Sequence, residues 1–211
     1  MGLRWEQGRE VLVNREEWDE RYGTEELIWK ADPNRFLVEE VAALAPGRAL
    51  DVACGEGRNA VWLATKGWRV TGADFSGVGL AKAQRLADDR EVEVTWVEAN
   101  VVEWQPPAAS FDLVVVMYLH LRAEQRRQAL ARAAAALAPG GVLLVVGHDT
   151  SNLLKGTGGP QDPAILFEPE DIVEELTGLR IERAERVTRT VITDAGEATA
   201  IDALVRAVRP R

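Results

Sequence analysis

Two carboxylates and a pair of glycines form the most informative group in this chain of 211 residues. Asp51 ends an apolar run and is followed closely by the turn that contains Gly55 and Gly57. A Gly-x-Gly turn between a strand and a helix lets the backbone turn sharply and lets a ligand approach without a Cβ in the way. Asp74 ends the next apolar run, where a carboxylate can accept both hydroxyls of a ribose. The pattern therefore predicts a nucleoside-bearing ligand at this turn.

Asp51 separates the two ligand classes that this turn could bind. Together with Ala60, the glycines also match the G-x-G-x-x-A fingerprint of dinucleotide-binding proteins. A carboxylate beside the turn would repel a pyrophosphate, whereas it would attract a ligand that bears an ammonium and a sulfonium. Asp51 therefore favours S-adenosylmethionine, while Asp74 is compatible with either ligand. An oxidoreductase that uses NAD(P) remains the alternative.

The chain has two histidines, and both are candidates for acid–base chemistry. His120 and His148 each follow a predicted strand, at the edge where ligands bind in open α/β sheets. Since an ordinary histidine has a pKa of about 6.5, either ring could take a proton from a hydroxyl or an amine. The alternative is that each ring is hydrogen-bonded to nearby backbone and shapes its loop. We expect no metal site, because cysteine and histidine ligands are scarce.

Short β-branched runs alternate with longer helical runs, which is typical of a parallel α/β sheet. We expect strands at 48–53, 69–74, 92–97, 111–117 and 142–147, and an antiparallel pair at 180–192 and 199–208. Helices are expected at 14–23, 33–44, 59–66, 77–88, 123–137 and 169–176. Residues 149–168 contain several glycines and prolines and show no periodicity, so we expect a lid or binding loop there that covers the acceptor substrate; the alternative is a flexible connector.

The overall counts exclude several classes of protein. The chain carries 25 basic and 34 acidic side chains, a formal net charge of −9, which argues against nucleic acid or an anionic membrane as a partner. A single cysteine, Cys54, excludes an internal disulfide and suits a reducing cytoplasm. No apolar run reaches the roughly 18 residues of a membrane span, and residues 1–20 lack the apolar stretch of a signal peptide. We expect one cytoplasmic domain that acts on a small molecule; its oligomeric state is left open.

These motifs resemble those of class I S-adenosylmethionine-dependent methyltransferases. The Asp-x-x-x-Gly-x-Gly pattern of residues 51–57 is similar to the first motif of that family, and Asp74 is similar to the second. Residues 54–59 are similar to the tellurite-resistance and thiopurine-type branch, which acts on small molecules. Residues 111–115 resemble the fourth-strand motif, and residues 137–141 resemble the turn before strand five.

The resemblance implies both a fold and an activity. The fold is a Rossmann-like three-layer αβα sandwich, whose seven-stranded sheet has the order 3-2-1-4-5-7-6 with strand 7 antiparallel. The activity is transfer of a methyl group from S-adenosylmethionine to a small-molecule acceptor by in-line displacement, which leaves S-adenosylhomocysteine. Helices within residues 1–45 would form a lid over the cofactor. The alternatives are the oxidoreductase and a non-catalytic binding module on the same fold.

The resemblance also assigns the residues that would bind the cofactor. Those around the glycine turn and the ribose are Asp51, Ala53, Gly55, Gly57, Asn59, Asp74, Phe75 and Ser76. Asn100 stands where the family often has an aspartate near the adenine amine, although an amide carries no charge. Val101, beside it, would form a wall of the adenine site.

The remaining assignments surround the methyl group. Met117 and Tyr118, at the end of the fourth strand of the sheet, would lie under it. Trp18 and Tyr22 are four residues apart and share one face of the first predicted helix. The ring of Tyr22 could cover the sulfonium, a contact worth about 0.5–2 kcal/mol. The alternative for both aromatic residues is a hydrophobic stripe that docks the helix.

Overall fold

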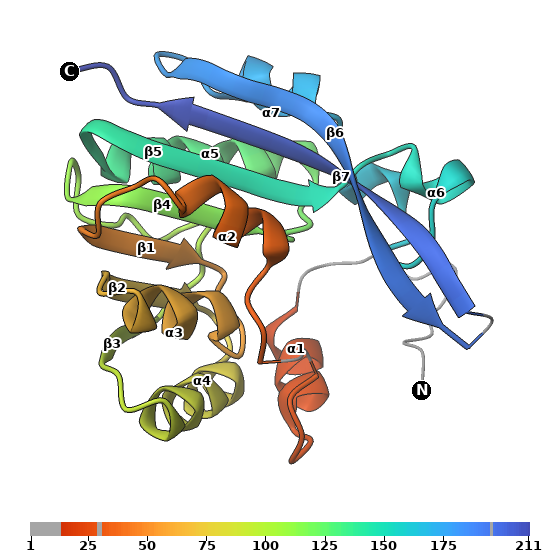
Figure 1. Ribbon diagram of the computed structural model, residues 1–211, viewed down its shortest axis with the longest axis horizontal. Helices are drawn as coiled ribbons and strands as arrows, with labels where there is room; N and C mark the ends of the chain where they lie inside the picture. The colour runs from red at the N-terminus through yellow and green to blue at the C-terminus, as the bar shows by residue number, and fades with distance from the viewer. Residues whose placement is uncertain (1–13, 29–30, 195) are drawn as a thin grey trace.

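The computed structural model describes residues 14–28, 31–194 and 196–211. These residues form a seven-stranded sheet in the order β3-β2-β1-β4-β5-β7-β6, and Figure 1 shows helices packed against it. Strands β1 to β5 pair in parallel, whereas β7 is antiparallel to both of its neighbours. The predicted strand order and the antiparallel seventh strand are therefore confirmed.

The strands are β1 (Arg48–Val52), β2 (Arg69–Asp74), β3 (Val94–Glu98), β4 (Phe111–Met117), β5 (Leu137–His148), β6 (Arg180–Thr193) and β7 (Gly196–Val208). The α-helices are α1 (Arg15–Tyr22), α2 (Arg35–Val41), α3 (Arg58–Thr65), α4 (Gly77–Asp89), α5 (Ala123–Ala136), α6 (Asn152–Lys155) and α7 (Pro169–Glu175). A 3₁₀ turn, η1 (Pro163–Ile165), completes the described elements. None of these helices is long and apolar enough to span a membrane.

Three segments differ from the sequence prediction. The predicted stop at residues 139–141 lies inside β5, which begins at Leu137 opposite Phe111 and continues past a register shift. Residues 149–168 contain α6 and η1, and both are too short to show a helical period in the sequence. Helix α2 is shorter than expected because Asn34 caps it, its side-chain oxygen accepting the N–H of Phe36.

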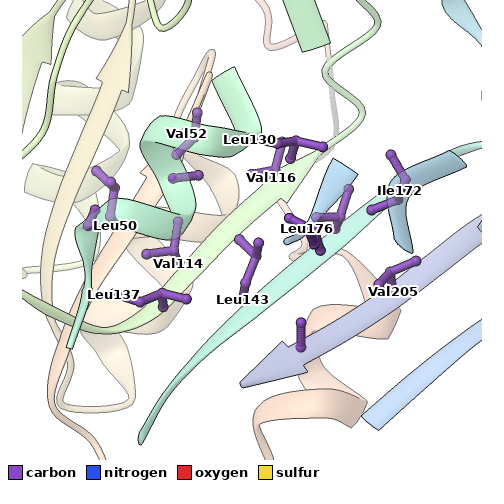
Figure 2. Close-up of a cluster of buried hydrophobic side chains, with 14 of the residues drawn as sticks. Leu50, Val52, Val114, Val116, Leu130, Leu137, Leu143, Ile172, Leu176 and Val205 are labelled. Atoms are coloured by element: carbon purple, nitrogen blue, oxygen red, sulfur yellow. The ribbon is translucent and has the colours of Figure 1, made fainter. Parts of the chain in front are cut away.

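The core lies on both faces of the sheet, because successive residues of a strand point to opposite sides. One cluster joins the central strands to α5 and α7, and Figure 2 labels Leu50, Val52, Val114, Val116, Leu130, Leu137, Leu143, Ile172, Leu176 and Val205 within it. The cluster on the other face joins the intervening strand residues to α2 and α3, through side chains that include Leu37 and Leu63. Helices on both faces confirm the three-layer arrangement.

A buried ion pair joins the two helices on one face of the sheet. Arg126 of α5 donates two hydrogen bonds to Glu175 of α7, at 3.1 and 2.8 Å, and both side chains are buried. The guanidinium also lies 5.3 Å from the centre of the Phe167 ring. Because the pair is bidentate and shielded from water, loss of one partner leaves an uncompensated buried charge.

We predict that Arg126→Met lowers the free energy of unfolding by about 3–5 kcal/mol, because it leaves the Glu175 carboxylate buried without its partner. The double variant Arg126→Met/Glu175→Leu should recover most of this loss, since it removes the stranded charge as well. Urea denaturation of both variants measures the effect. A single variant as stable as the wild type would contradict the prediction.

Candidate functional site

Asp74 ties the glycine turn to the end of β2. Its carboxylate accepts the backbone N–H of Gly55 at 2.8 Å with one oxygen and the N–H of Ser76 at 2.9 Å with the other. Burial raises the pKa of Asp74, and these backbone hydrogen bonds oppose that shift. Since each carboxylate oxygen has two lone pairs, Asp74 can still accept the hydroxyls of a ribose. Phe75 lies half-buried between Asp74 and Ser76.

The glycines of the turn are required by close packing. Gly57 has φ +78° and precedes α3; a Cβ there would lie 2.7 Å from Ala83 and 2.8 Å from the Trp96 ring. Gly55 has φ +54°, and a Cβ there would lie 2.7 Å from the hydroxyl of Tyr22. The turn can therefore come close to neighbouring groups only because both positions lack side chains.

Asp51 is a buried acid with an unsatisfied oxygen. Its side chain is 1% exposed, and its Oδ2 has no hydrogen-bond partner among residues 14–28, 31–194 and 196–211. Burial raises the pKa of Asp51 to about 7, against the effects of the Ala60 backbone and the Arg58 charge. Two residues further on, Ala53 has φ +57°, a backbone conformation that is uncommon for alanine. A buried carboxylate oxygen without a partner fits a cationic ligand group such as an ammonium.

Helix α1 packs against α4 and over the turn. Tyr22 is buried with its hydroxyl beside Gly55, and the Trp18 ring lies 5.3 Å from its own. The Asp19 carboxylate accepts the hydroxyl of Ser76, the residue that caps α4. The described part of the predicted lid therefore contacts both the glycine turn and the end of β2; residues 1–13 of that lid lie outside the described residues.

A buried lysine fixes the chain that follows α1. The Lys82 ammonium lies 2.7 Å from the Glu56 carboxylate and donates to the carbonyl oxygens of Tyr22, at 3.2 Å, and Glu26, at 2.6 Å. Glu56 in turn accepts the N–H of Ile28 at 3.1 Å. Because Glu56 lies between the two glycines of the turn, this network links the position of Tyr22 to the shape of the turn.

Three of the predicted cofactor residues have mainly local contacts. The Asn59 oxygen accepts the backbone N–H of Asn34 at 2.9 Å, which positions the start of α2. Asn100 is exposed, and its side-chain oxygen accepts the N–H of Val102 at 3.0 Å within its own turn. Val101 is buried beside it. The Asn100 oxygen keeps a second lone pair, so it could still accept from an adenine amine.

The two histidines lie together at the ends of β4 and β5. Their rings are stacked, with centres 5.2 Å apart, and the Nε2 of His120 accepts the backbone N–H of His148 at 3.3 Å. Burial, reinforced by the neighbouring His148, lowers the pKa of His120 to about 3. His120 is therefore neutral near pH 7 and shapes the loop, whereas His148 remains the better candidate for a base.

Sequence reasoning missed two residues, Asp202 and Arg189, which complete the cluster around the two histidines. The carboxylate of Asp202, on β7, accepts the Tyr118 hydroxyl at 2.9 Å and the Arg189 Nε at 2.8 Å. It also lies 3.2 Å from the Nδ1 of His148. One signal was available, because Asp202 interrupts an apolar strand and a buried carboxylate needs partners. No motif links these positions, which come together only through strand pairing.

The residues around the glycine turn and the residues around the two histidines lie at the same edge of the sheet. Met117 is buried at the end of β4, and Tyr118 follows it with φ +58°. Burial lowers the pKa of Arg58, at the start of α3, while Tyr118 and Asp51 raise it. Because Arg58 interacts with groups of both sets, the two clusters are close enough to form one site.

The segment 149–168 folds over His148. A Cβ at Gly159, which has φ +77°, would lie 2.7–2.8 Å from the His148 ring. Arg186 of β6 contacts Asp149 at 3.0 Å and Glu168 at 2.8 Å, and so holds both ends of the segment. The geometry makes this segment a candidate cover for a ligand beside His148.

Residues 49–141 match a family model described as a methyltransferase domain. The chain is 35% identical over 123 residues to a demethylmenaquinone methyltransferase of Thermus thermophilus, covering 57% of this chain and 54% of the relative. It is 31% identical over 116 residues to a trans-aconitate 2-methyltransferase of Afipia carboxidovorans, covering 54% of this chain and 43% of the relative. The chain thus spans about half the length of these curated relatives.

Solved structures agree on the fold. The N-methyltransferase NodS from Bradyrhizobium japonicum, in complex with S-adenosyl-L-homocysteine, has a TM-score of 0.70 at 20% identity, over 93% of this chain and 98% of that chain. These matches do not confirm the tellurite-resistance and thiopurine-type branch. Residues 49–141 thus match a methyltransferase domain, and the strand order and the solved neighbours agree with the class I S-adenosylmethionine-dependent methyltransferase fold.

Proposed function

We propose that this chain transfers a methyl group from S-adenosylmethionine to a small-molecule acceptor. The observation that carries the proposal is the buried Asp51 carboxylate, whose Oδ2 has no protein partner within the described residues and lies next to a glycine turn. An ammonium group of the cofactor would satisfy this oxygen and compensate its charge. The same carboxylate disfavours the pyrophosphate of a dinucleotide, so the oxidoreductase alternative is not favoured.

The neighbouring residues can hold the rest of the cofactor. Asp74 would accept the ribose hydroxyls with the lone pairs that Gly55 and Ser76 leave free. Tyr22 would cover the ligand from α1, and Met117 would pack beneath it. When bound, S-adenosylmethionine supplies a methyl group on a positively charged sulfur. These residues would bind the cofactor and exclude water from it.

The acceptor would approach from the ends of β4 and β5, under segment 149–168. His148 faces this side of the site and can take a proton from the acceptor. Alignment of two bound reactants can contribute about 7–11 kcal/mol to the rate enhancement, so positioning is a major part of the work of the protein. We also propose that residues 1–211 act as one domain, in which the N-terminal helices form a lid over the cofactor.

Calorimetry and a methyl-transfer screen test the function directly. We expect S-adenosylmethionine and S-adenosylhomocysteine to bind and NADPH not to bind, and we expect at least one small molecule of a library to be methylated. Asp74→Ala should weaken cofactor binding by about 10–100-fold, since it removes hydrogen bonds to a charged group. Binding of NADPH alone would contradict the proposal, and cofactor binding without turnover would favour the non-catalytic module.

The raised pKa of Asp51 predicts that cofactor affinity depends on pH. With a pKa of about 7, Asp51 holds a proton at pH 6 in the free protein. A bound cation stabilises the ionised form, so binding releases this proton and the affinity should fall about tenfold per pH unit below pH 7. Titration calorimetry at pH 6, in buffers with different ionisation enthalpies, measures the released proton.

The matched control for this experiment is Asp51→Asn, which keeps the shape of the side chain but cannot ionise. This variant should bind S-adenosylmethionine more weakly than the wild type at pH 8, and its affinity should change little between pH 6 and pH 8. If the affinity of the wild type does not change with pH over this range, Asp51 does not meet the charged part of the cofactor.

Segment 149–168 should become better protected when the site is filled. We expect slower amide hydrogen exchange there in the presence of S-adenosylhomocysteine and an acceptor found in the screen, because the segment closes over both. Residues 137–141, at the amino end of β5 and so at the opposite edge of the sheet from His148, provide an internal reference whose exchange should stay the same. Unchanged exchange in residues 149–168 would argue that they do not cover the acceptor.

A further inference from the structure

A direct strand pairing places a second buried acid against the candidate base. His148 and Asp202 are opposite one another in the antiparallel pair of β5 and β7. Asp202 is completely buried, and its Oδ1 lies 3.2 Å from the Nδ1 of His148. Both atoms are buried and neither has an aligned hydrogen bond in the part of the chain that the structure describes, although the two lie in direct contact. The two atoms can therefore satisfy only each other.

The other oxygen of Asp202 is fully occupied. Its Oδ2 accepts the Tyr118 hydroxyl at 2.9 Å and the Arg189 Nε at 2.8 Å, and Arg189 also donates to the Tyr118 oxygen at 3.1 Å. Burial alone would raise the pKa of Asp202. Contacts with His148, Arg189 and Tyr118 outweigh this effect and keep the pKa below its ordinary value. Asp202 is thus an ionised carboxylate, which can only accept hydrogen bonds.

This arrangement fixes the position of the proton on His148. Because an ionised carboxylate faces Nδ1, the neutral ring must carry its proton there. Its Nε2 is then left with a free lone pair and can act as a base. After Nε2 has taken a proton, the Asp202 charge stabilises the resulting imidazolium. His120 cannot replace it, since its Nε2 already accepts the backbone N–H of His148.

The need for a base distinguishes between classes of acceptor. A carboxylate is already ionised near pH 7, and a thiol ionises readily because its pKa is about 8.5. A neutral amine can attack while it still holds its protons. A hydroxyl is different, since it would become an unstable oxonium unless a base removes its proton as the new bond forms.

We propose that Asp202 is a positioning residue for His148, and that the methyl acceptor is a hydroxyl group of a small molecule. The proposal rests on the methyl transfer proposed above. The hydroxyl oxygen uses a lone pair to form a bond to the methyl carbon, and the carbon–sulfur bond breaks with its electron pair leaving on sulfur. The hydroxyl proton passes to the Nε2 of His148. The products are a methyl ether, S-adenosylhomocysteine and protonated His148, which then releases the proton to water.

Asp202→Asn is a sharp test, because the surrounding donors dictate how the new amide would sit. Tyr118 and Arg189 both donate to the Oδ2 position, so the amide oxygen must occupy it. The amide NH₂ then faces the Nδ1 of His148, which has to accept. The proton of His148 moves to Nε2, and the base is lost although the packing is unchanged.

Nitrogen-15 NMR of the histidine rings at pH 8 shows which ring nitrogen carries the proton, and it needs neither cofactor nor substrate. The chain has two histidines, so one variant, His120→Gln, assigns both sets of signals. We expect the proton on Nδ1 of His148 in the wild type and on Nε2 in Asp202→Asn. A wild-type His148 with its proton on Nε2 would overturn the role of Asp202, even if the variant fails to fold.

Kinetics test the acceptor class. A library of phenols and alcohols, with thiol, amine and carboxylate analogues of the same skeletons, is screened with saturating S-adenosylmethionine. We expect turnover of hydroxyl compounds, and we expect Asp202→Asn to lower kcat on the order of 100-fold while the cofactor Kd stays within about twofold. Turnover restricted to thiols, amines or carboxylates would overturn the acceptor assignment.

The matched control is Glu175→Gln, which changes another buried, arginine-paired carboxylate into an amide outside the site. It should lose stability but keep the wild-type kcat at 20 °C, and an equal loss of kcat in both variants would assign Asp202 a structural role only. If the proposed methyl transfer itself is wrong, the result is different. The cofactor does not bind and no compound is turned over, while the tautomer of His148 can still be measured.

Discussion

Parallel pairing of β1 with β2 and of β4 with β5 is the constraint on which the site depends. It brings the carboxyl ends of these strands to one edge of the sheet, where loops follow and backbone ladders stop. Asp51 and Asp74 end β1 and β2 in this way, and Tyr118 and His148 end β4 and β5. A one-residue slip in register would turn each side chain to the opposite face. The hydrophobic clusters on both faces resist such a slip, and so hold the polar edge in place.

Three of the buried acids at this edge obtain their hydrogen bonds in different ways. Asp74 uses the backbone N–H groups of Gly55 and Ser76, so it is satisfied by local chain geometry. Asp202 accepts hydrogen bonds from the side chains of Tyr118, directly after β4, and Arg189 of β6, and it also contacts His148 of β5. Asp51 retains an oxygen without a partner among the described residues. The Oδ1 of Asp202 has the Nδ1 of His148 beside it, whereas the Oδ2 of Asp51 has no hydrogen-bond partner among the described residues, so Asp51 most clearly calls for a cationic ligand.

The difference between contacts within neighbouring segments and contacts between distant strands also explains what could be predicted from the sequence. Asp51, Gly55 and Asp74 lie in adjacent strand–turn units, so their spacing alone predicted a nucleoside site, whereas the strand order followed from the resemblance to class I methyltransferases. Asp202 reaches His148 through antiparallel pairing of strands far apart in the chain. Such contacts leave no spacing to recognise in the sequence, because they depend on the register of β5 with β7. A carboxylate inside an apolar strand was the one available signal.

Local errors in the prediction have an equally physical origin. Residues 139–141 contain a proline and two glycines and were expected to end a helix with a turn, but β5 runs through them. Leu137 can already pair with Phe111, and the register shift beyond it absorbs the irregular residues. In segment 149–168, the 3₁₀ turn depends on Asp162, whose side chain accepts the N–H of Ala164. Capping of so short an element produces no periodic pattern.

The state of Asp51 couples ligand binding to stability. Its pKa rises from 3.8 to about 7 on folding, so between these values the folded protein holds a proton that the unfolded chain has lost. The contribution of Asp51 to the free energy of unfolding therefore falls as the pH rises from 4 to 7, and above pH 7 its buried charge opposes folding in full. A cationic ligand reverses this, because it supplies the missing counter-charge. The group that makes the fold less stable at neutral pH is thus the group whose charge a cationic ligand would compensate.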